Sequence, residues 1–543
     1  MKRRAKLFLL ITMTLFVSIS CNLQTPTIAL TQGAPFQDIG DSYAKTEIAA
    51  LYRDNIMAGV KPGFFAPKQP MTRAQFLTTL VRLLRLTPVQ AKVPAYSDVA
   101  SSSWYYGYIQ AATEIGLASG TGAGTFSPDR PLSRQEAAAW IVRAFKQQPS
   151  SATALSPYRD QSEIAPWALP YVNTVTKLQF MGGYERMFQP NQPLSRQEAA
   201  SLLYRIQAHK PWMDEIGKEM SPKIQIGWQY GQTTQQYEHN VLNSNVNVLS
   251  PRWFFLEKGG KLQDYSDPSL ITWAKQQDKA VWAMLGNRFD MEATHELLAS
   301  SAETADFTRS IVSTVQKYGL QGINVDFENV KPEDRPYFTR FIKLLGEQMH
   351  SAGAVLSVNV SPELGSDWTA AFDYAAIGKY ADYVVLMGYD EHWAGGSYAG
   401  SVSSLPWVRS GLDTLRQDVP DHKLILALPF YNRDWTTKGS SSNAALASTD
   451  ITLQEQTDLM VRYKFRPIWN ENLGQYNAAY TSGAAHRLWL EDSRSLSLKY
   501  QMAASRGIAG YAYWHIGGET PDVWTSLSNA ERYSTYLFHS FDL

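Results

Sequence analysis

The sequence predicts a multidomain protein in which an α-helical three-repeat module precedes an α/β (β/α)8 barrel with a small α+β insertion before the last strand. The first observation is length, because 543 residues exceed what one hydrophobic core usually holds. The second is a pattern that recurs at constant spacing in the N-terminal third. The third is an alternation of eight short apolar runs with amphipathic stretches, which is typical of parallel βα units.

Residues 1–29 have the pattern of a signal peptide. A basic start is followed by the apolar run 7–19, which has 13 residues and is too short to cross a bilayer comfortably. Cys21, the only cysteine, follows this run. It is either a lipid-anchor site or part of the removed peptide, and Ser18 stands where a lipoprotein signal usually has Leu. We expect an extracellular protein with no transmembrane helix, because no later segment reaches 18 apolar residues.

Three copies of one unit follow. Their boundaries are predicted at 30–92, 93–153 and 154–208. Arg73, Arg134 and Arg196 lie 61 and 62 residues apart, each directly after a Thr or Ser that begins a capping-box pattern. Each unit is therefore predicted to be a helix, a Gly-containing loop and a capped helix. An Arg in a first helical turn is disfavoured by the helix dipole, so we expect a ligand or a partner carboxylate to offset that cost.

These repeats resemble the S-layer homology family. The resemblance rests on Asp38, Asp98 and Asp160, on Phe-x-Pro loops, and on Thr-Arg-Ala-Gln or Ser-Arg-Gln-Glu segments. It implies a helical module that binds pyruvylated secondary cell-wall polymer, with the three arginines on the anionic sugar. The alternative is a purely structural module.

The family's aromatic position is filled by Trp104 and Trp167, which the resemblance implies are also wall-polymer contacts. The first repeat departs from the pattern, because it has Tyr43 at that position and Gln75 in place of the usual Glu. We therefore expect its groove to bind more weakly.

Residues 209–222 contain two prolines and are predicted to be a linker, and 223–543 are predicted to form the barrel. The eight expected strands are 224–228, 246–249, 281–285, 322–328, 355–360, 383–388, 424–428 and 510–514. The long gap 431–506 before the last strand predicts the inserted subdomain. Because barrel enzymes carry their chemistry at the carboxyl ends of strands, polar residues there are candidate site residues.

The fourth strand carries carboxylates on one face. Side chains alternate along a strand, so Asn324, Asp326 and Glu328 share the side opposite Ile323 and Val325. A buried parallel strand is normally apolar on both faces, and paired carboxylates raise the pKa of one member. A Glu that holds its proton beside a charged partner is suited to general acid catalysis, although a half-exposed polar face would give the same pattern.

This strand resembles glycoside hydrolase family 18 when it is taken together with Met387-Gly388-Tyr389-Asp390 and Tyr513-Trp514. The sequence of these motifs is most similar to the spore-cortex-lytic branch of that family. The resemblance implies the following roles: Glu328 as catalytic acid, Asp326 as its partner, Tyr389 and Asp390 as acetamido contacts, and Trp514 as sugar platform. Gln321 and Asn324 depart from the family pattern. Asn324, Met387, Glu391 and His392 are further candidates for substrate binding; His392 is equally a candidate loop hydrogen-bonder, and Trp407 and Trp435 are open between subsite and core.

The amino-acid composition argues against several classes of function for this protein. Lys plus Arg and Asp plus Glu both number 50, so net charge is zero and gives no sign of nucleic-acid binding. One cysteine excludes a disulfide framework and a cysteine metal site. His295-Glu296 begins a zinc motif, but Ala299 replaces the second His. We expect neither a metal nor another cofactor.

The leading prediction is a wall-anchored retaining glycoside hydrolase that cleaves β-1,4 bonds after N-acetylglucosamine in peptidoglycan. The family resemblance implies substrate-assisted catalysis, in which the acetamido oxygen replaces an enzyme nucleophile. A chitinase acting on chitin or chitooligosaccharides would use the same residues. A non-catalytic wall lectin or S-layer component is the third alternative, and the intact Glu328 argues against it.

Overall fold

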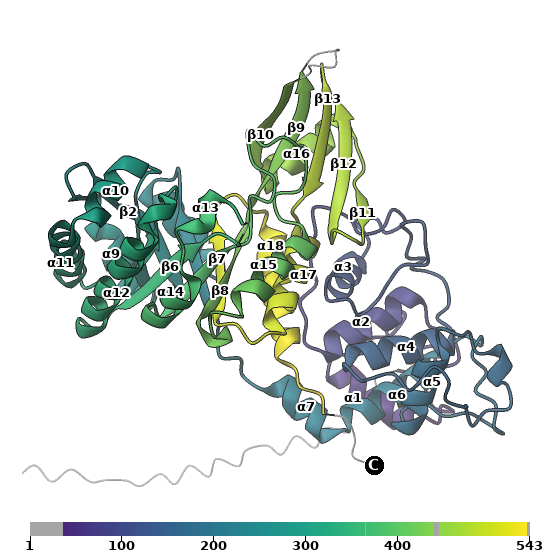
Figure 1. Cartoon of the computed structure of the whole chain (residues 1–543). Helices are drawn as coiled ribbons and strands as arrows, with labels where there is room; N and C mark the ends of the chain where they lie inside the picture. The colour runs from purple at the N-terminus through teal and green to yellow at the C-terminus, as the bar shows by residue number, and fades with distance from the viewer. Residues whose placement is uncertain (1–35, 364, 439–444, 540–543) are drawn as a thin grey trace, which may run out of the picture.

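The computed structural model describes residues 36–363, 365–438 and 445–539. The predicted signal peptide 1–29 and the candidate lipid site Cys21 lie outside these residues. Figure 1 shows three parts: a helical module, a barrel beside it, and a sheet that projects from the barrel.

Each repeat contributes two helices to the N-terminal module: α1 (Lys45–Arg53) and α2 (Arg73–Leu83), α3 (Tyr106–Glu114) and α4 (Arg134–Ala144), and α5 (Leu169–Lys177) and α6 (Arg196–Gln207). These helices pack across the repeat boundaries, α2 against α3, α4 against α5 and α6 against α1. A capping box begins the second helix of each repeat, as predicted. The segments before these helices hydrogen-bond in a closed cycle, in which Met71 N–H donates to Leu194, Leu194 to Leu132, and Leu132 to Met71. This cycle gives the module a pseudo-threefold arrangement.

The eight predicted strands form a closed parallel barrel. They are β1 (Ile224–Gln229), β2 (Val248–Glu257), β4 (Ala280–Gly286), β5 (Gly322–Asp326), β6 (Val355–Val360), β7 (Tyr383–Met387), β8 (Leu424–Pro429) and β14 (Gly510–Trp514). Neighbouring strands pair in parallel, and a β1–β2 pairing closes the ring. A short strand, β3 (Lys261–Asp264), adds an antiparallel hairpin to β2 that the sequence pattern did not predict.

Helices cover the outside of the barrel, and large apolar side chains fill the layer between them and the strands. The helices are α8 (Thr234–Leu242), α9 (Pro268–Gln276), α10 (Met291–Ala299), α11 (Ser301–Tyr318), α12 (Arg335–Ser351), α13 (Asp367–Ala370), α14 (Tyr374–Tyr380), α15 (Leu405–Leu415), α17 (Ser493–Ala504) and α18 (Pro521–Thr535). Short 3-10 turns lie at Gln161–Glu163, Pro332–Asp334 and Asp421–Lys423.

The insertion is a five-stranded antiparallel sheet with one helix. Its elements are β9 (Tyr431–Lys438), β10 (Ala445–Thr452), α16 (Leu453–Tyr463), β11 (Ile468–Asn470), β12 (Gln475–Thr481) and β13 (Ala485–Leu490). The strand order is β10-β9-β13-β12-β11. It stands above the barrel in Figure 1 and occupies the predicted gap.

The predicted linker is not extended throughout. It contains the helix α7 (Lys210–Gly217), whose Trp212 and Ile216 are buried in the core of the repeats. Pro211 lies in the first turn, where a missing N–H costs nothing. Pro211, which had suggested an extended linker, therefore lies in the first turn of a helix.

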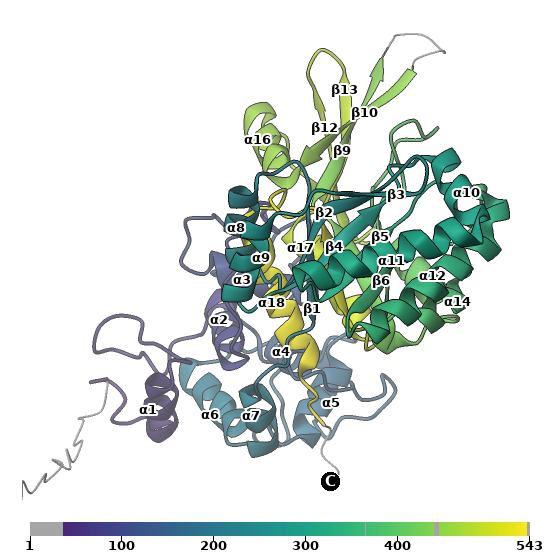
Figure 2. The same ribbon diagram turned by 90° about the vertical axis from the view of Figure 1, so that its left-hand side faces the viewer.

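The two halves of the molecule share a core. Tyr533, Tyr536 and Phe538, at the C-terminal end of α18 and just beyond it, pack among the buried residues of the repeats. The carboxylate of Glu114 on α3 is buried and accepts hydrogen bonds from Ser493 (2.8 Å) and Ser526 (2.7 Å) of the barrel helices. Figures 1 and 2 both place α17 and α18 next to the repeat module. The described helices include none with both the length and the apolar character needed to cross a bilayer.

Candidate functional site

The carboxylates predicted from the fourth strand point into a cavity at the barrel mouth. Ile323 and Val325 pack on the outer side of β5, while Asp326 and Glu328 line a cavity of about 720 Å³. The strand ends at Asp326, two residues earlier than predicted, and Glu328 follows in the loop. The alternation of faces nevertheless continues through Phe327, which is buried among the outer residues.

Burial is the main reason that Glu328 holds its proton. Burial, followed by the charges of Asp326 and Asp390, raises the pKa of Glu328 well above its ordinary value, against a smaller opposing effect of Arg252. Burial also raises the pKa of Asp326, but a hydrogen bond from Asn359 and the charge of Arg252 oppose this effect. The two carboxyl groups are thereby pushed apart in acidity, which is the arrangement expected of an acid and a charged partner.

Two asparagines, one directly after β4 and one on β6, hold the backbone of Glu328 and the carboxylate of Asp326. The buried Asn287 side chain donates to the backbone carbonyl of Glu328 (2.7 Å) and accepts from its N–H (3.1 Å). Asn359 on β6 donates to Asp326 Oδ1 at 2.9 Å. Asn287 therefore fixes the backbone of the candidate acid, and Asn359 fixes the carboxylate of its partner.

Asn324 lies beneath the cavity and is fully buried. Its oxygen accepts from Trp228 Nε1 (2.9 Å), and its amide donates to Ser357 Oγ (3.0 Å) and Asn359 Oδ1 (2.8 Å). Asn324 is absent from the cavity lining, although it was a candidate for substrate binding. Its hydrogen bonds instead orient Asn359, which in turn holds Asp326.

The segment directly after β7 contributes a phenol, Tyr389, and a third carboxylate, Asp390, to the cavity. Tyr389 lines the cavity, and burial together with three nearby carboxylates raises its pKa well above the ordinary value, so the phenol keeps its proton. Asp390 has a left-handed backbone (φ 63), which Asp tolerates better than most residues. Its carboxylate accepts from Tyr431 (2.7 Å) and Arg433 (3.0 Å) of the insertion, which thus completes this side of the mouth.

Aromatic side chains form much of the remaining wall. Trp514 at the end of β14 and Met387 line the cavity as predicted. Trp407 also lines it, whereas Trp435 is buried and donates to the carbonyl of Gly400 at 2.9 Å. The lining also contains residues that the prediction did not include, among them Phe289, Trp368 and Asn359, and Trp393 lies here too. Such rings are suited to stack against sugar faces.

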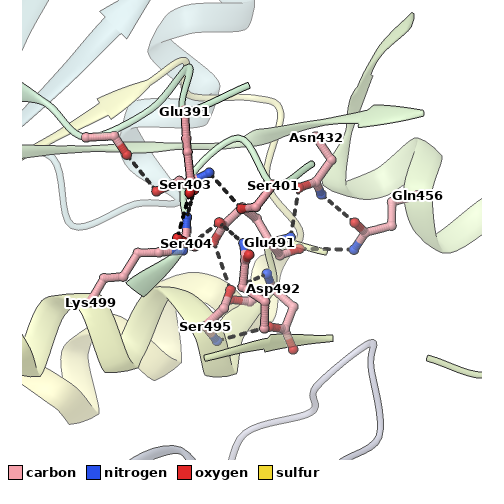
Figure 3. Close-up of polar contacts among 12 residues, drawn as sticks. Glu391, Ser401, Ser403, Ser404, Asn432, Gln456, Glu491, Asp492, Ser495 and Lys499 are labelled. Carbon is pink, nitrogen blue, oxygen red and sulfur yellow. Dashed lines mark hydrogen bonds and ion pairs between the residues drawn. The ribbon is translucent and has the colours of Figure 1, made fainter. Parts of the chain in front are cut away.

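Glu391 and His392 hold a loop and are absent from the cavity lining. The Glu391 carboxylate accepts from the N–H (2.7 Å) and hydroxyl (3.0 Å) of Ser404, and His392 Nδ1 lies 2.8 Å from the carbonyl of Ser401. Figure 3 shows Glu391 with Ser404 beside a buried ion pair, Glu491 and Lys499, near the base of the insertion. The structure places Glu391 and His392 where they shape the loop that presents Trp393.

In the repeats, each motif arginine reaches into the next unit of the cycle. Arg73 donates to the carbonyls of Phe126 (2.9 Å) and Ser119 (3.2 Å), and its guanidinium pairs with Glu136 at 2.6 Å. Arg134 makes the equivalent contacts with Phe188, Gly182 and Glu198. The partner carboxylate expected from the dipole argument is thus present in two of the three repeats.

Arg196 differs because Gln75 stands where the other repeats have Glu. It donates to the carbonyls of Phe65 (2.7 Å) and Ala58 (2.5 Å), but within the described ranges no carboxylate pairs with it. Burial lowers its pKa to about 10. This groove, with a volume of about 360 Å³, is lined by Arg196, Gln75 and Trp104. Gln75 therefore leaves Arg196 without the ion pair that Arg73 and Arg134 make, and the weaker binding expected for this groove stays a prediction.

The other aromatic positions of the repeats are exposed. Tyr43 lies with Arg134 along a second groove of about 240 Å³. Trp104 and Trp167 are 60% and 51% exposed, which is unusual for Trp and typical of a binding surface. No cluster of three metal-ligating side chains is found within residues 36–363, 365–438 and 445–539.

A closed barrel with paired carboxylates and a phenol beneath aromatic rings defines a glycoside-cleaving barrel enzyme. The family model described as Glycosyl hydrolases family 18 matches residues 224–519, and the S-layer homology domain model matches 35–77, 95–138 and 157–200. The chain belongs to glycosyl hydrolases family 18 and carries three S-layer homology repeats.

Related proteins match a little over half of this chain. An uncharacterized glycosylase, YvbX, from Bacillus subtilis (strain 168) is 27% identical over 328 residues, which cover 58% of this chain and 94% of the relative. A cortical fragment-lytic enzyme from Bacillus anthracis is 30% identical over 300 residues, covering 53% and 68%. The crystal structure of the Bacillus cereus spore cortex-lytic enzyme SleL is 25% identical, with a TM-score of 0.52, and the match covers 56% of this chain and 74% of that one.

Proposed function

We propose that this protein is a wall-anchored glycosidase that cleaves the β-1,4 bond after N-acetylglucosamine in peptidoglycan, with retention of configuration. The observation that carries the proposal is the cavity that Glu328, Asp326 and Tyr389 share with Trp514. A protonated carboxyl group, an ionised partner and a phenol donor there suit a substrate with an acetamido group. The wall-binding repeats favour peptidoglycan as the source of that group.

The proposed reaction needs no enzyme nucleophile. Glu328 donates its proton to the leaving oxygen while the acetamido oxygen of the substrate attacks the anomeric carbon. Asp326 stabilises the positive charge of the oxazolinium ion, and Tyr389 donates to the acetamido carbonyl. Glu328, now ionised, then accepts a proton from the water that opens this intermediate, and retention results from the two displacements.

The test compares wild type with Glu328→Gln on purified peptidoglycan, with released muropeptides identified by mass spectrometry. We expect turnover to fall by about 10²–10⁴-fold while sugar binding is kept, because the amide cannot donate an acidic proton. Glu296→Gln is the matched control, since Glu296 is exposed on α10 outside the cavity. Equal turnover by wild type and Glu328→Gln would falsify the acid assignment.

Chitin is a second candidate substrate, because the aromatic lining of the cavity suits neutral sugar faces. The same assay with chitin oligomers separates the two substrates by the products released. Peptidoglycan as the better substrate by kcat/KM supports the leading proposal, and chitin as the better substrate supports the second candidate.

We also propose that the grooves beside Arg73, Arg134 and Arg196 bind the anionic wall polymer, with Trp104 and Trp167 contacting its sugars. The arginines are partly structural, so the exposed tryptophans give the cleaner test. Trp104→Ala in the full-length chain is expected to weaken co-sedimentation with purified cell walls without changing thermal stability. Undiminished co-sedimentation of a Trp104→Ala, Trp167→Ala double variant would contradict the proposal.

A further inference from the structure

Arg252 is a cation at the barrel mouth that the predicted chemistry does not use. It lies on β2, with an apolar interior residue, Val248, four positions earlier on the same face. Its guanidinium carbon is 5.1 Å from the ring centroid of Tyr230 and 5.9 Å from that of Trp514. Trp514 lines the cavity, so Arg252 lies at the edge of the site.

Among the residues that the structure describes, no carboxylate pairs with the Arg252 guanidinium. Within the described residues it forms no ion pair, and its buried Nε has no hydrogen-bond acceptor. Its charge opposes the rise in the pKa of Asp326 and Glu328, so it lies close enough to act on both carboxylates although it forms no ion pair with either. The aromatic rings offset part of the cost of burying a cation, but an unpaired guanidinium remains costly until an anion approaches.

We propose that Arg252 binds a carboxylate of the muramyl sugar next to the N-acetylglucosamine that stacks on Trp514. This inference rests on the proposed function and names the part of the substrate that the enzyme selects. Muramic acid carries a 3-O-lactyl group that ends in a carboxylate or in a peptide with free carboxylates, whereas chitin carries none. An arginine fork is complementary to a carboxylate, and pairing through the terminal nitrogens would give the Arg252 charge its anionic partner.

The proposal makes Arg252 a specificity-determining residue. Asp326, Glu328 and Tyr389 require only an acetamido group, so they do not distinguish peptidoglycan from chitin. An uncompensated cation beside the platform favours the anionic glycan, because a charged hydrogen bond forms only with it. A neutral glycan leaves the guanidinium unpaired.

The test uses the full-length protein and peptidoglycan tetrasaccharides in three forms. One form keeps its peptides, the second has lost them and ends in the free lactyl carboxylate, and the third has every carboxyl group amidated. We expect wild type to give a kcat/KM about 10- to 100-fold higher for a charged form than for the amidated form. The form that gives the larger ratio identifies the lactyl group or the peptide as the source of the carboxylate.

Arg252→Met is expected to bring the ratio of charged to amidated substrate close to one, whatever happens to the absolute rates. Loss of Arg252 also raises the pKa of Asp326 and Glu328, so each enzyme is assayed at its own optimum pH. Arg288→Met is the matched control, because Arg288 lies 3.9 Å from the ring centroid of Phe255 but pairs with Glu257 at 3.6 Å. It is expected to keep the wild-type ratio.

A wild-type ratio near one, or a ratio that survives in Arg252→Met, overturns the proposal. If Arg252→Met does not fold, the ratio of charged to amidated substrate in wild type and in Arg252→Gln still tests the proposal. Failure of the proposed function gives a different result, namely no release from any form. In that case binding of the charged and amidated glycans to Glu328→Gln tests Arg252 separately.

Discussion

The barrel mouth and the repeat grooves both combine charged groups with aromatic rings, but they pair their charges differently. In the repeats, Arg73 satisfies two carbonyls and one carboxylate in another unit, so its charge is used to hold the units together. At the mouth, Glu328 has a raised pKa, and Arg252 contacts aromatic rings but forms no ion pair within the described part of the chain. A charge that is fully paired within the chain is stabilising, whereas a charge left without a partner is available to a substrate.

Removing a paired charge should cost stability most. Arg73→Ala is expected to lower the free energy of unfolding of the repeats by about 3–5 kcal/mol, because two carbonyls lose a donor, Glu136 keeps only Arg130 as a cationic partner, and a buried side chain is removed. Thermal and urea unfolding of the full-length chain, followed by circular dichroism, measure this. Arg53→Ala, which removes an exposed pair with Asp54, is the control and should unfold like wild type. Equal unfolding of the two variants would contradict the structural role of Arg73.

The contact between the two regions should respond to pH. Burial raises the pKa of Glu114 to about 8 from an ordinary 4.5, so its protonated form is favoured in the folded chain. The associated stability is fully present below about pH 4.5 and is lost as pH rises through about 8, at up to about 1.4 kcal/mol per pH unit. Glu114→Gln should remove this slope in unfolding measurements between pH 5 and 8. Glu163→Gln, on the surface, should retain it, and a slope unchanged in Glu114→Gln would show that Glu114 is not its source.

A weaker effect is expected from the support of the catalytic pair. Asn359→Ala removes the hydrogen bond that lowers the pKa of Asp326, so that pKa should rise. Ionised Asp326 is then available only at higher pH, and the acidic limb of the pH–rate profile should move upward, with roughly tenfold lower kcat below the optimum. Asn359→Asp removes the donated hydrogen bond and adds a carboxylate beside Asp326, so it should move the acidic limb further upward than Asn359→Ala does. An unmoved acidic limb in Asn359→Ala would exclude this positioning role.

The smallest effect concerns the unpaired groove of the repeats. Gln75→Glu should supply Arg196 with the carboxylate that its counterparts have, and affinity for an anionic wall polymer should fall by a few-fold. The reciprocal variant Glu136→Gln should raise affinity in the groove of Arg73. Titration calorimetry with purified wall polymer measures both. Opposite changes would support the original sequence expectation that Gln75 weakens binding.

Local sequence patterns were sufficient to predict the fold and part of the candidate site. Apolar runs bounded by turns predicted all eight barrel strands, and alternation along 322–328 predicted that Asp326 and Glu328 share the cavity. Asn287, Arg252 and Asn359 were missed because a single polar residue in or just after an apolar strand forms no pattern. The signal available was their position at the carboxyl ends of neighbouring strands, where any interior polar residue merits attention.

Contacts between distant segments left no local signal. The helix α7 was hidden because Pro211 suggested a linker. The packing of Tyr533 and Tyr536 among the repeats joins residues that are several hundred positions apart, so periodicity could not reveal it. Nor could spacing show that Arg196 lacks the carboxylate given to Arg73 and Arg134, because the pairing crosses from one repeat to another.

The shared core of Tyr533, Tyr536 and Phe538 has a consequence for how the enzyme covers its polymer. Under the proposed wall attachment, an enzyme on a flexible tether would reach a wide area around its attachment point, whereas the shared core holds this barrel in one orientation relative to the repeats. Each attached molecule would then cleave only the wall polymer within reach of its attachment site, and cleavage over a larger area would require release and reattachment. Deleting the repeats would free the barrel from that restriction but leave three large rings exposed to water.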